Sequence, residues 1–186
     1  MKLIFSILFV LIVIISGCKN VDDEIETELN TIQQASLESG IPSADIIYKK
    51  EITDNDAFSL FQIPDGYGVL HFTSKEDGWG YRGHSGYQYD IGDITSFTLS
   101  QSAWHKGDIS LDKDSLYTMV FLGEIIDPKI NKIIVEYDNI KREASIVKNK
   151  DRRFWYLLSE QEDGNESVNM VSAYSSEGKL LYIEEG

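Results

Sequence analysis

The sequence predicts an α+β fold in which antiparallel β-structure predominates. Only one stretch shows helical periodicity, and it lies near the N-terminus. From Asp45 onward, short β-branched and aromatic runs alternate with turns rich in Asp and Gly, and no second helical stripe separates them as a βαβ pattern would require. We therefore expect one N-terminal helix packed on β-hairpins, followed by a small β-sandwich or β-sheet unit.

The predicted helix runs roughly from Asp22 to Ser39. Ile25, Leu29 and Ile32 recur at three- and four-residue spacing, so they share one face. Gly40 follows as a helix stop. The stripe favours packing on the domain's own sheet, and binding to a partner remains the alternative.

Two series of strands follow the helix, separated by turn residues. Their spacing of about 8–14 residues is typical of small antiparallel β units. We place a first lobe at residues 24–110 and an all-β, sandwich-like lobe at residues 111–186. The predicted strands are Ile46–Ile52, Ala57–Ile63, Gly68–Thr73, Trp79–Arg82 and Ile94–Leu99 in the first lobe, and Tyr117–Ile126, Lys132–Tyr137, Ala144–Lys148, Phe154–Ser159, Val168–Tyr174 and Lys179–Ile183 in the second.

The first 17 residues have the pattern of an export signal. Lys2 precedes a core of thirteen almost purely apolar residues, Leu3–Ile15, which is short for a membrane span. The ending Ile15-Ser16-Gly17-Cys18 resembles the lipobox of bacterial lipoprotein precursors. That resemblance implies cleavage after Gly17, diacylation of Cys18 (a palmitate-type anchor) and a lipidated tether over residues 18–23. We therefore expect a protein attached to the outer face of the cell membrane. An uncleaved anchor or an ordinary signal peptide is the alternative.

Composition narrows the possible partners. The net charge of −14 disfavours nucleic acid, whose phosphates require clustered Lys and Arg. Cys18 is the single cysteine, so the chain has no internal disulfide, and lipidation of its sulfur would leave no thiolate to bind zinc. We assign no cofactor.

Three segments in the β region resemble small uncharacterised lipoproteins of Gram-positive, Firmicute-type bacteria. They are Gly123–Ile130, Phe154-Trp155-Tyr156 and Ala173–Tyr182. The resemblance implies a cellular compartment and brings no assigned reaction.

The candidate binding surface comes from a glycine- and aromatic-rich stretch. Half of the 14 glycines lie between Gly66 and Gly92, interleaved with Tyr and Trp. Glycine lets a backbone approach a ligand closely, and Tyr or Trp offers a flat apolar area with a polar edge. Ordinary hairpins with aromatic side chains packed across strands are the alternative. The candidate residues are Trp79, Tyr81, Arg82, His84, Tyr87, Tyr89 and, just beyond, Trp104, which joins either this surface or the core.

No catalytic constellation is apparent from the spacing of chemically active residues. We therefore predict a non-catalytic binding or accessory module for an envelope protein, a wall polymer or a secreted peptide. The rival is a small, metal-assisted extracytoplasmic hydrolase that uses His71, His84 or His105 with a nearby carboxylate. An immunity or inhibitor lipoprotein is a further alternative.

Overall fold

The structure is a computed structural model that describes residues 32–40, 45–75, 78–88, 96–106, 117–159 and 167–186. Within these ranges it contains twelve strands in three four-stranded antiparallel sheets, and one short helical segment at residues 32–37. The predicted predominance of antiparallel β-structure is confirmed. The predicted signal peptide, Cys18 and the tether lie outside the described residues.

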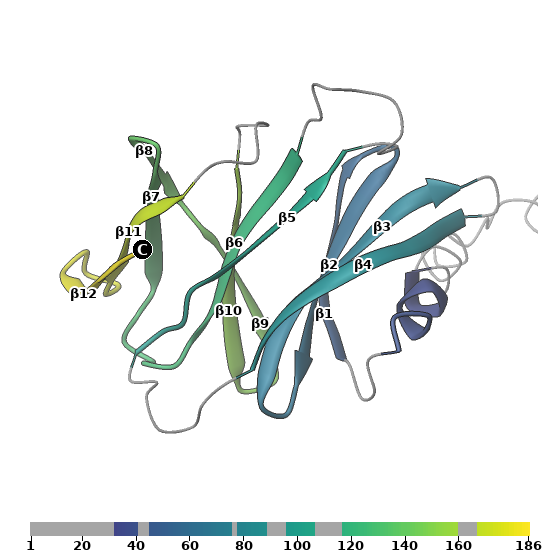
Figure 1. The fold of residues 1–186 in the computed structure, drawn as a ribbon. Coiled ribbons are helices and arrows are strands. Elements are labelled where there is room, and N and C mark those ends of the chain that lie inside the picture. The colour runs from purple at the N-terminus through teal and green to yellow at the C-terminus, as the bar shows by residue number, and fades with distance from the viewer. Residues whose placement is uncertain (1–31, 41–44, 76–77, 89–95, 107–116, 160–166) are drawn as a thin grey trace, which may run out of the picture.

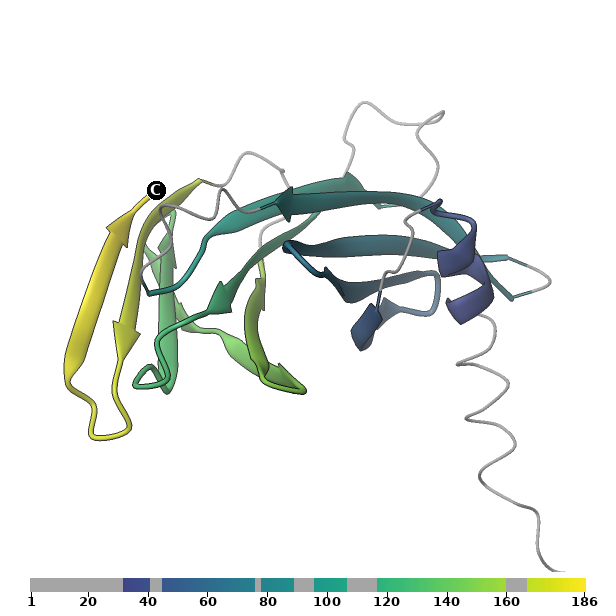
Figure 2. The same ribbon diagram turned by 90° about the horizontal axis from the view of Figure 1, so that it is seen from below.

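The three sheets follow one another across the molecule, with sheet B in the middle (Figures 1 and 2). Sheet A is a meander of β1 (Asp45–Thr53), β2 (Asp56–Ile63), β3 (Gly66–Lys75) and β4 (Gly78–Gln88). Sheet B has the order β5 (Ser100–His105), β6 (Tyr117–Ile125), β10 (Arg152–Leu158) and β9 (Ser145–Asn149). Sheet C has the order β12 (Leu180–Glu185), β11 (Val168–Tyr174), β7 (Lys132–Tyr137) and β8 (Ile140–Glu143).

Sheet B is buried on both faces. Along β6, Val120 and Leu122 belong to a cluster shared with sheet A, which we call the A/B core. Met119 and Phe121 belong to a cluster shared with sheet C, the B/C core. A strand covered on both sides needs apolar residues at odd and even positions, which explains the continuous apolar run of β6.

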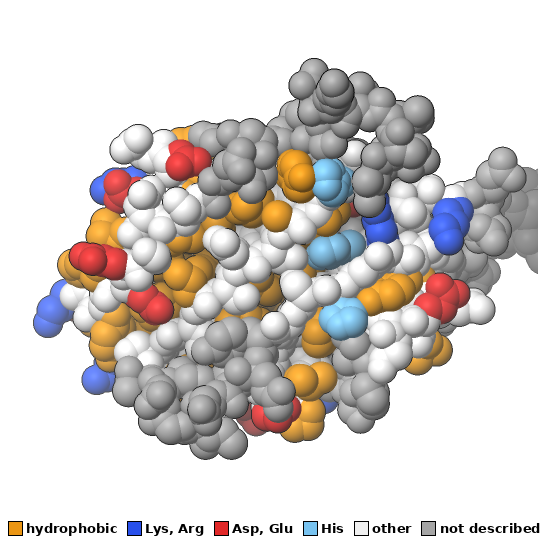
Figure 3. All heavy atoms as spheres, in the orientation of Figure 1, with side chains coloured by type: hydrophobic (Ala, Val, Ile, Leu, Met, Phe, Trp, Pro, Cys, Tyr) orange, Lys and Arg blue, Asp and Glu red, His pale blue; other side chains and the backbone are white. Residues whose placement is uncertain are grey.

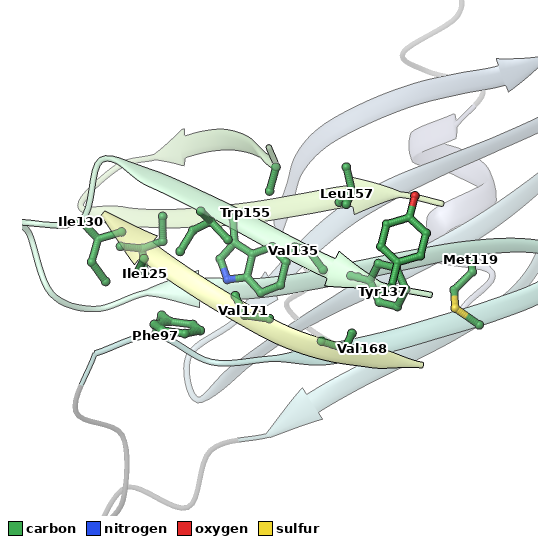
Figure 4. Packing of buried hydrophobic residues seen from close by; sticks show 14 residues of the cluster. Phe97, Met119, Ile125, Ile130, Val135, Tyr137, Trp155, Leu157, Val168 and Val171 are labelled. Carbon is green, nitrogen blue, oxygen red and sulfur yellow. The ribbon is translucent and has the colours of Figure 1, made fainter. Parts of the chain in front are cut away.

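The B/C core is built around Trp155, whose side chain is fully buried (Figure 4). Its indole Nε1 donates a hydrogen bond to the carbonyl oxygen of Thr98 at 3.1 Å. The indole lies against Gly123, where an added Cβ would sit 1.8 Å from the Thr98 oxygen and 2.4 Å from Trp155 Nε1. Glycine at 123 therefore makes room for both groups.

The helical segment lies beside sheet A, at the end of the molecule away from sheet C (Figure 2). Ile32 and Ala35 are buried in a third cluster with Phe61, Leu70 and Phe72 of sheet A. The segment ends at Gly40, whose φ of 66° lies in the left-handed region that favours glycine, as the predicted helix stop requires. The earlier part of the predicted helix, before residue 32, lies outside the described residues.

Arg152 ties sheet B to sheet A. Its guanidinium donates to both carboxylate oxygens of Glu124, at 2.8 and 2.7 Å, within sheet B. It also donates to the carbonyl oxygens of Ile63 at 2.7 Å and Gly66 at 3.0 Å, at the turn between β2 and β3. Five fixed donors make arginine suited to such a four-bond junction.

Two expectations about the strands are wrong. The predicted strand Ile94–Leu99 is not seen in its described part, residues 96–99, where Phe97 makes only an isolated bridge to Ile125. The strand of this region begins directly after Leu99, as β5. The structure also contains β8, which the sequence interpretation missed.

The predicted lobe boundary between residues 110 and 111 lies outside the described residues. The strands on its two sides, β5 and β6, are hydrogen-bonded neighbours in sheet B, paired from Ser100↔Leu122 to His105↔Tyr117.

Candidate functional site

The predicted binding residues divide between two edge strands. Sheet A ends at β4 and sheet B ends at β5, each on the face shown in Figure 3. Trp79, Tyr81, Arg82 and His84 lie in β4, and Trp104 lies in β5. Tyr87 pairs with Tyr67 through the β4 backbone, but its side chain is not described, and Tyr89 lies outside the described residues.

A β-bulge at Arg82 arranges the β4 side chains. The register shifts there, so that Tyr81 pairs with Phe72 while His84 pairs with Leu70. Paired residues share a face of the sheet, so Tyr81 and His84 lie together on the face that also contacts the helical segment. The Tyr81 hydroxyl is hydrogen-bonded to Nδ1 of His84, and burial raises the pKa of Tyr81.

His71 occupies the opposite face of sheet A, towards sheet B. Its ring stacks on Trp104, with 3.8 Å between ring centroids and 23° between planes. Its Nε2 lies 3.3 Å from the Ser102 hydroxyl oxygen. Burial, helped by the positive charge of Arg82, lowers the pKa of His71 to about 3, so this imidazole is neutral at pH 7.

Trp104 is also fixed from its other side. It is 7% exposed and belongs to the A/B core, the second of the two alternatives that the sequence left open. Its Nε1 donates to the Asp56 carboxylate, with distances of 3.2 and 3.4 Å to the two oxygens. The Thr118 hydroxyl donates to the same carboxylate at 3.1 Å. Asp56, Thr118, Trp104, His71 and Ser102 thus form one polar network, which we call the rim network.

The three histidines of the chain lie in a row on one face of the molecule (pale blue in Figure 3). His71 is almost completely buried, whereas His84 is exposed. His105 packs against Tyr117 with 4.1 Å between ring centroids, and its buried Nδ1 has no hydrogen-bond partner among the described residues. Across those same residues, no group of three or more His, Cys, Asp or Glu side chains is placed to hold a metal ion.

The contact between Ser102 and His71 has the composition of a nucleophile and its general base. A base with a pKa of about 3 has little tendency to take a proton at neutral pH, so this pair is poorly matched to that task. The contacts of the network stack two rings and supply hydrogen-bond partners to buried polar atoms between the sheets.

Sequence reasoning missed Asp56, Ser102 and Thr118 as members of this network. Trp104 and Asp56 are 48 residues apart in the chain, and no local pattern brings them together. A weak signal was present, because the β2 strand begins with an Asp directly before a mostly apolar run.

The fold and site together define a three-layered antiparallel β protein with two edge strands, β4 and β5, on one face. In the part of the chain that the structure describes, no helix has the length and apolarity needed to cross a membrane. Comparison of the chain with protein-family models, with curated proteins and with solved structures finds no match.

Proposed function

We propose that this chain is a bacterial lipoprotein, anchored through a lipid on Cys18 at the outer face of the cell membrane. Its folded part would act as a non-catalytic binding or accessory module for an envelope protein, a wall polymer or a secreted peptide. The observation that carries the proposal is the lipobox-like ending Ile15-Ser16-Gly17-Cys18 after a short apolar core. The division into a helix-plus-hairpin lobe and a sandwich-like lobe, at residues 24–110 and 111–186, belongs to the same proposal.

The β4 edge supports the binding role. In the described part of the chain β4 is hydrogen-bonded only to β3, so its outer edge offers backbone donors and acceptors to an extended ligand. The exposed imidazole of His84 and the Tyr81 hydroxyl lie side by side on one face of this edge. Trp79 and Tyr81 are half-buried against the sheet A cluster, so their rings are already ordered and lose little entropy on binding.

The anchor is tested by replacing Cys18 with Ala. We expect the wild-type protein to partition into detergent and to carry a lipid-modified residue 18 as its first residue by mass spectrometry. The Cys18→Ala variant should carry no lipid and should keep its unprocessed leader, Leu3–Ile15 included, so that residue 18 is not its first residue. If the wild type begins at an unmodified Met1 and carries no lipid, the lipoprotein proposal fails.

The binding edge is tested by photo-crosslinking in intact cells. A photoreactive phenylalanine derivative at His84 should capture one dominant partner or wall fragment. The same group at Asp151, which is exposed on the turn between β9 and β10, provides the matched control. Equal capture at both positions would remove the β4 edge from the proposal.

A metal-assisted hydrolase remains the second candidate, because the three histidines share one face (Figure 3). It requires a bound metal. If the protein is a binding module, elemental analysis of the purified protein should find less than one equivalent of zinc. One equivalent of tightly bound zinc that is lost in a His84→Ala variant would favour the hydrolase.

A further inference from the structure

Exposed apolar side chains gather at the far end of sheet C. Of the five large hydrophobic residues exposed in the described ranges, three lie in β12: Leu180 at 44%, Tyr182 at 37% and Ile183 at 54% exposure. A fourth, Ile126 at 42%, precedes Asp127, whose carboxylate accepts a 2.6 Å hydrogen bond from the Tyr182 hydroxyl. Such a cluster on an otherwise strongly charged chain indicates a contact surface.

β12 is also an edge strand. In the sheet order of the described strands its single neighbour is β11. Gly186 donates its backbone N–H to the carbonyl oxygen of Asn169, opposite it on β11. The pairing with β11 has a register shift at Leu181 and is regular from there to Gly186. Backbone groups in a regular antiparallel ladder alternate between the two sides, so those of Ile183 and Glu185 point away from β11 and, among the described strands, are open to another strand.

The sequence of this edge is complementary to itself. Lys179 and Glu185 lie three residues on either side of Tyr182. When two such strands run antiparallel about an axis at Tyr182, each lysine stands opposite a glutamate of the other strand. Glu184 then stands opposite Leu180, so no two like charges are paired directly.

We propose that β12 pairs with β12 of a second copy of this chain, antiparallel and about a two-fold axis at Tyr182. The contact is isologous and closed, so it gives a dimer in which the two C sheets continue into one another. Charge complementarity fixes this register. Moving the axis by one residue to Ile183 would place Glu184 opposite Tyr182 and leave Lys179 without its glutamate.

The two-fold axis gives a sharp test at residue 182. The Tyr182 backbone groups point towards β11, so Tyr182 would face its own copy as a non-hydrogen-bonded pair, with Cα atoms about 4.5 Å apart. Cysteines at that separation can form a disulfide. We expect the full chain with Tyr182→Cys to run mainly as a disulfide-linked dimer on a non-reducing gel after mild oxidation.

The matched control is Asp151→Cys, which places a cysteine on an exposed turn of sheet B and keeps Cys18 in the chain. It should give several-fold less dimer. Equal dimer in both variants would mean random collision and would overturn the proposal. So would crosslinking of Tyr182→Cys to a different protein, because the edge would then have another occupant.

A charge swap tests the register. In the Tyr182→Cys background, Lys179→Glu should lower the dimer fraction several-fold, and adding Glu185→Lys should restore it. Both residues are exposed, so circular dichroism should show an unchanged fold in each variant. A loss that the second substitution does not restore, in folded protein, would refute the pairing.

Discussion

The two interfaces of sheet B bury different chemistry although the same strand, β6, supplies both. On the B/C side, Met119, Phe121 and Gly123 present only apolar surface and backbone. On the A/B side, Val120 and Leu122 are apolar, but the flanking Thr118 and Glu124 are polar and hydrogen-bonded.

This contrast shows how the three sheets are held in position against one another. Apolar burial stabilises both interfaces but is non-directional. The A/B interface adds directional bonds at its two ends: the rim network at Asp56 and Trp104, and the Arg152 junction at Glu124. The B/C interface relies more on shape: Trp155 fills the space that Gly123 leaves, and its hydrogen bond runs to the Thr98 backbone rather than to a side chain of sheet C.

The largest loss of stability should come from removing the central side chain of the B/C core. Trp155→Ala removes a fully buried ring and its hydrogen bond to Thr98, and we expect a loss of about 3–5 kcal/mol in the free energy of unfolding. Urea denaturation measures it. Trp79→Ala, which truncates a half-buried tryptophan of β4, is the control and should cost clearly less. Similar losses at both positions would show that the shape of the B/C core is not decisive.

A smaller effect should distinguish the A/B interface from the B/C interface, because the stability contributed by the A/B interface should depend on pH. The folded-state pKa of His71 is about 3, below the usual value of 6.5, so the unfolded chain binds more protons between pH 3 and 6.5. Stability contributed by the neutral imidazole is therefore complete above pH 6.5 and decreases as the pH falls. Lowering the pH from 7 to 5 should cost about 2 kcal/mol through this residue.

The measurement compares urea denaturation of the wild type and His71→Gln at pH 7 and pH 5. Other groups titrate in this range too, among them Glu184, whose pKa is raised by burial, and subtraction removes their contribution. The variant should lose about 2 kcal/mol less than the wild type over the same interval. Parallel pH dependences would mean that the pKa of His71 is the same in the folded and the unfolded protein.

Much of the strand pattern was predictable from sequence because turns and apolar runs are local signals. Most predicted strands match observed ones within a few residues, and Lys132–Tyr137 and Val168–Tyr174 match at both ends. The missed strand β8 follows Asp138-Asn139, whose φ values of 43° and 64° form a two-residue hairpin turn. An Asp-Asn pair between apolar residues was the available signal.

The assembly of strands into layers was not predictable, because it depends on contacts between distant residues. In β5, the polar Ser100, Gln101 and Ser102 gave no apolar run, yet the strand is held by six pairs with β6. The candidate binding residues are divided between two strands and do not form one surface, for a related reason. The bulge at Arg82 arises when β4 pairs with β3, and the contact of Trp104 with Asp56 arises only when sheets A and B meet.

The smallest effect tests directional bonding with two buried tyrosines, one in each interface. The Tyr67 hydroxyl of the A/B core is hydrogen-bonded to the Thr98 hydroxyl at 2.7 Å, and that oxygen also accepts the backbone N–H of Glu124. The Tyr137 hydroxyl of the B/C core is buried and has no hydrogen-bond partner among the described residues. We expect Tyr67→Phe to cost about 1 kcal/mol and Tyr137→Phe to leave the free energy of unfolding unchanged or to raise it slightly. The denaturation midpoints of the two variants give the comparison. A larger loss for Tyr137→Phe than for Tyr67→Phe would show that the Tyr137 hydroxyl makes a stabilising polar contact inside the B/C core. That result would contradict the stronger directional bonding assigned to the A/B interface.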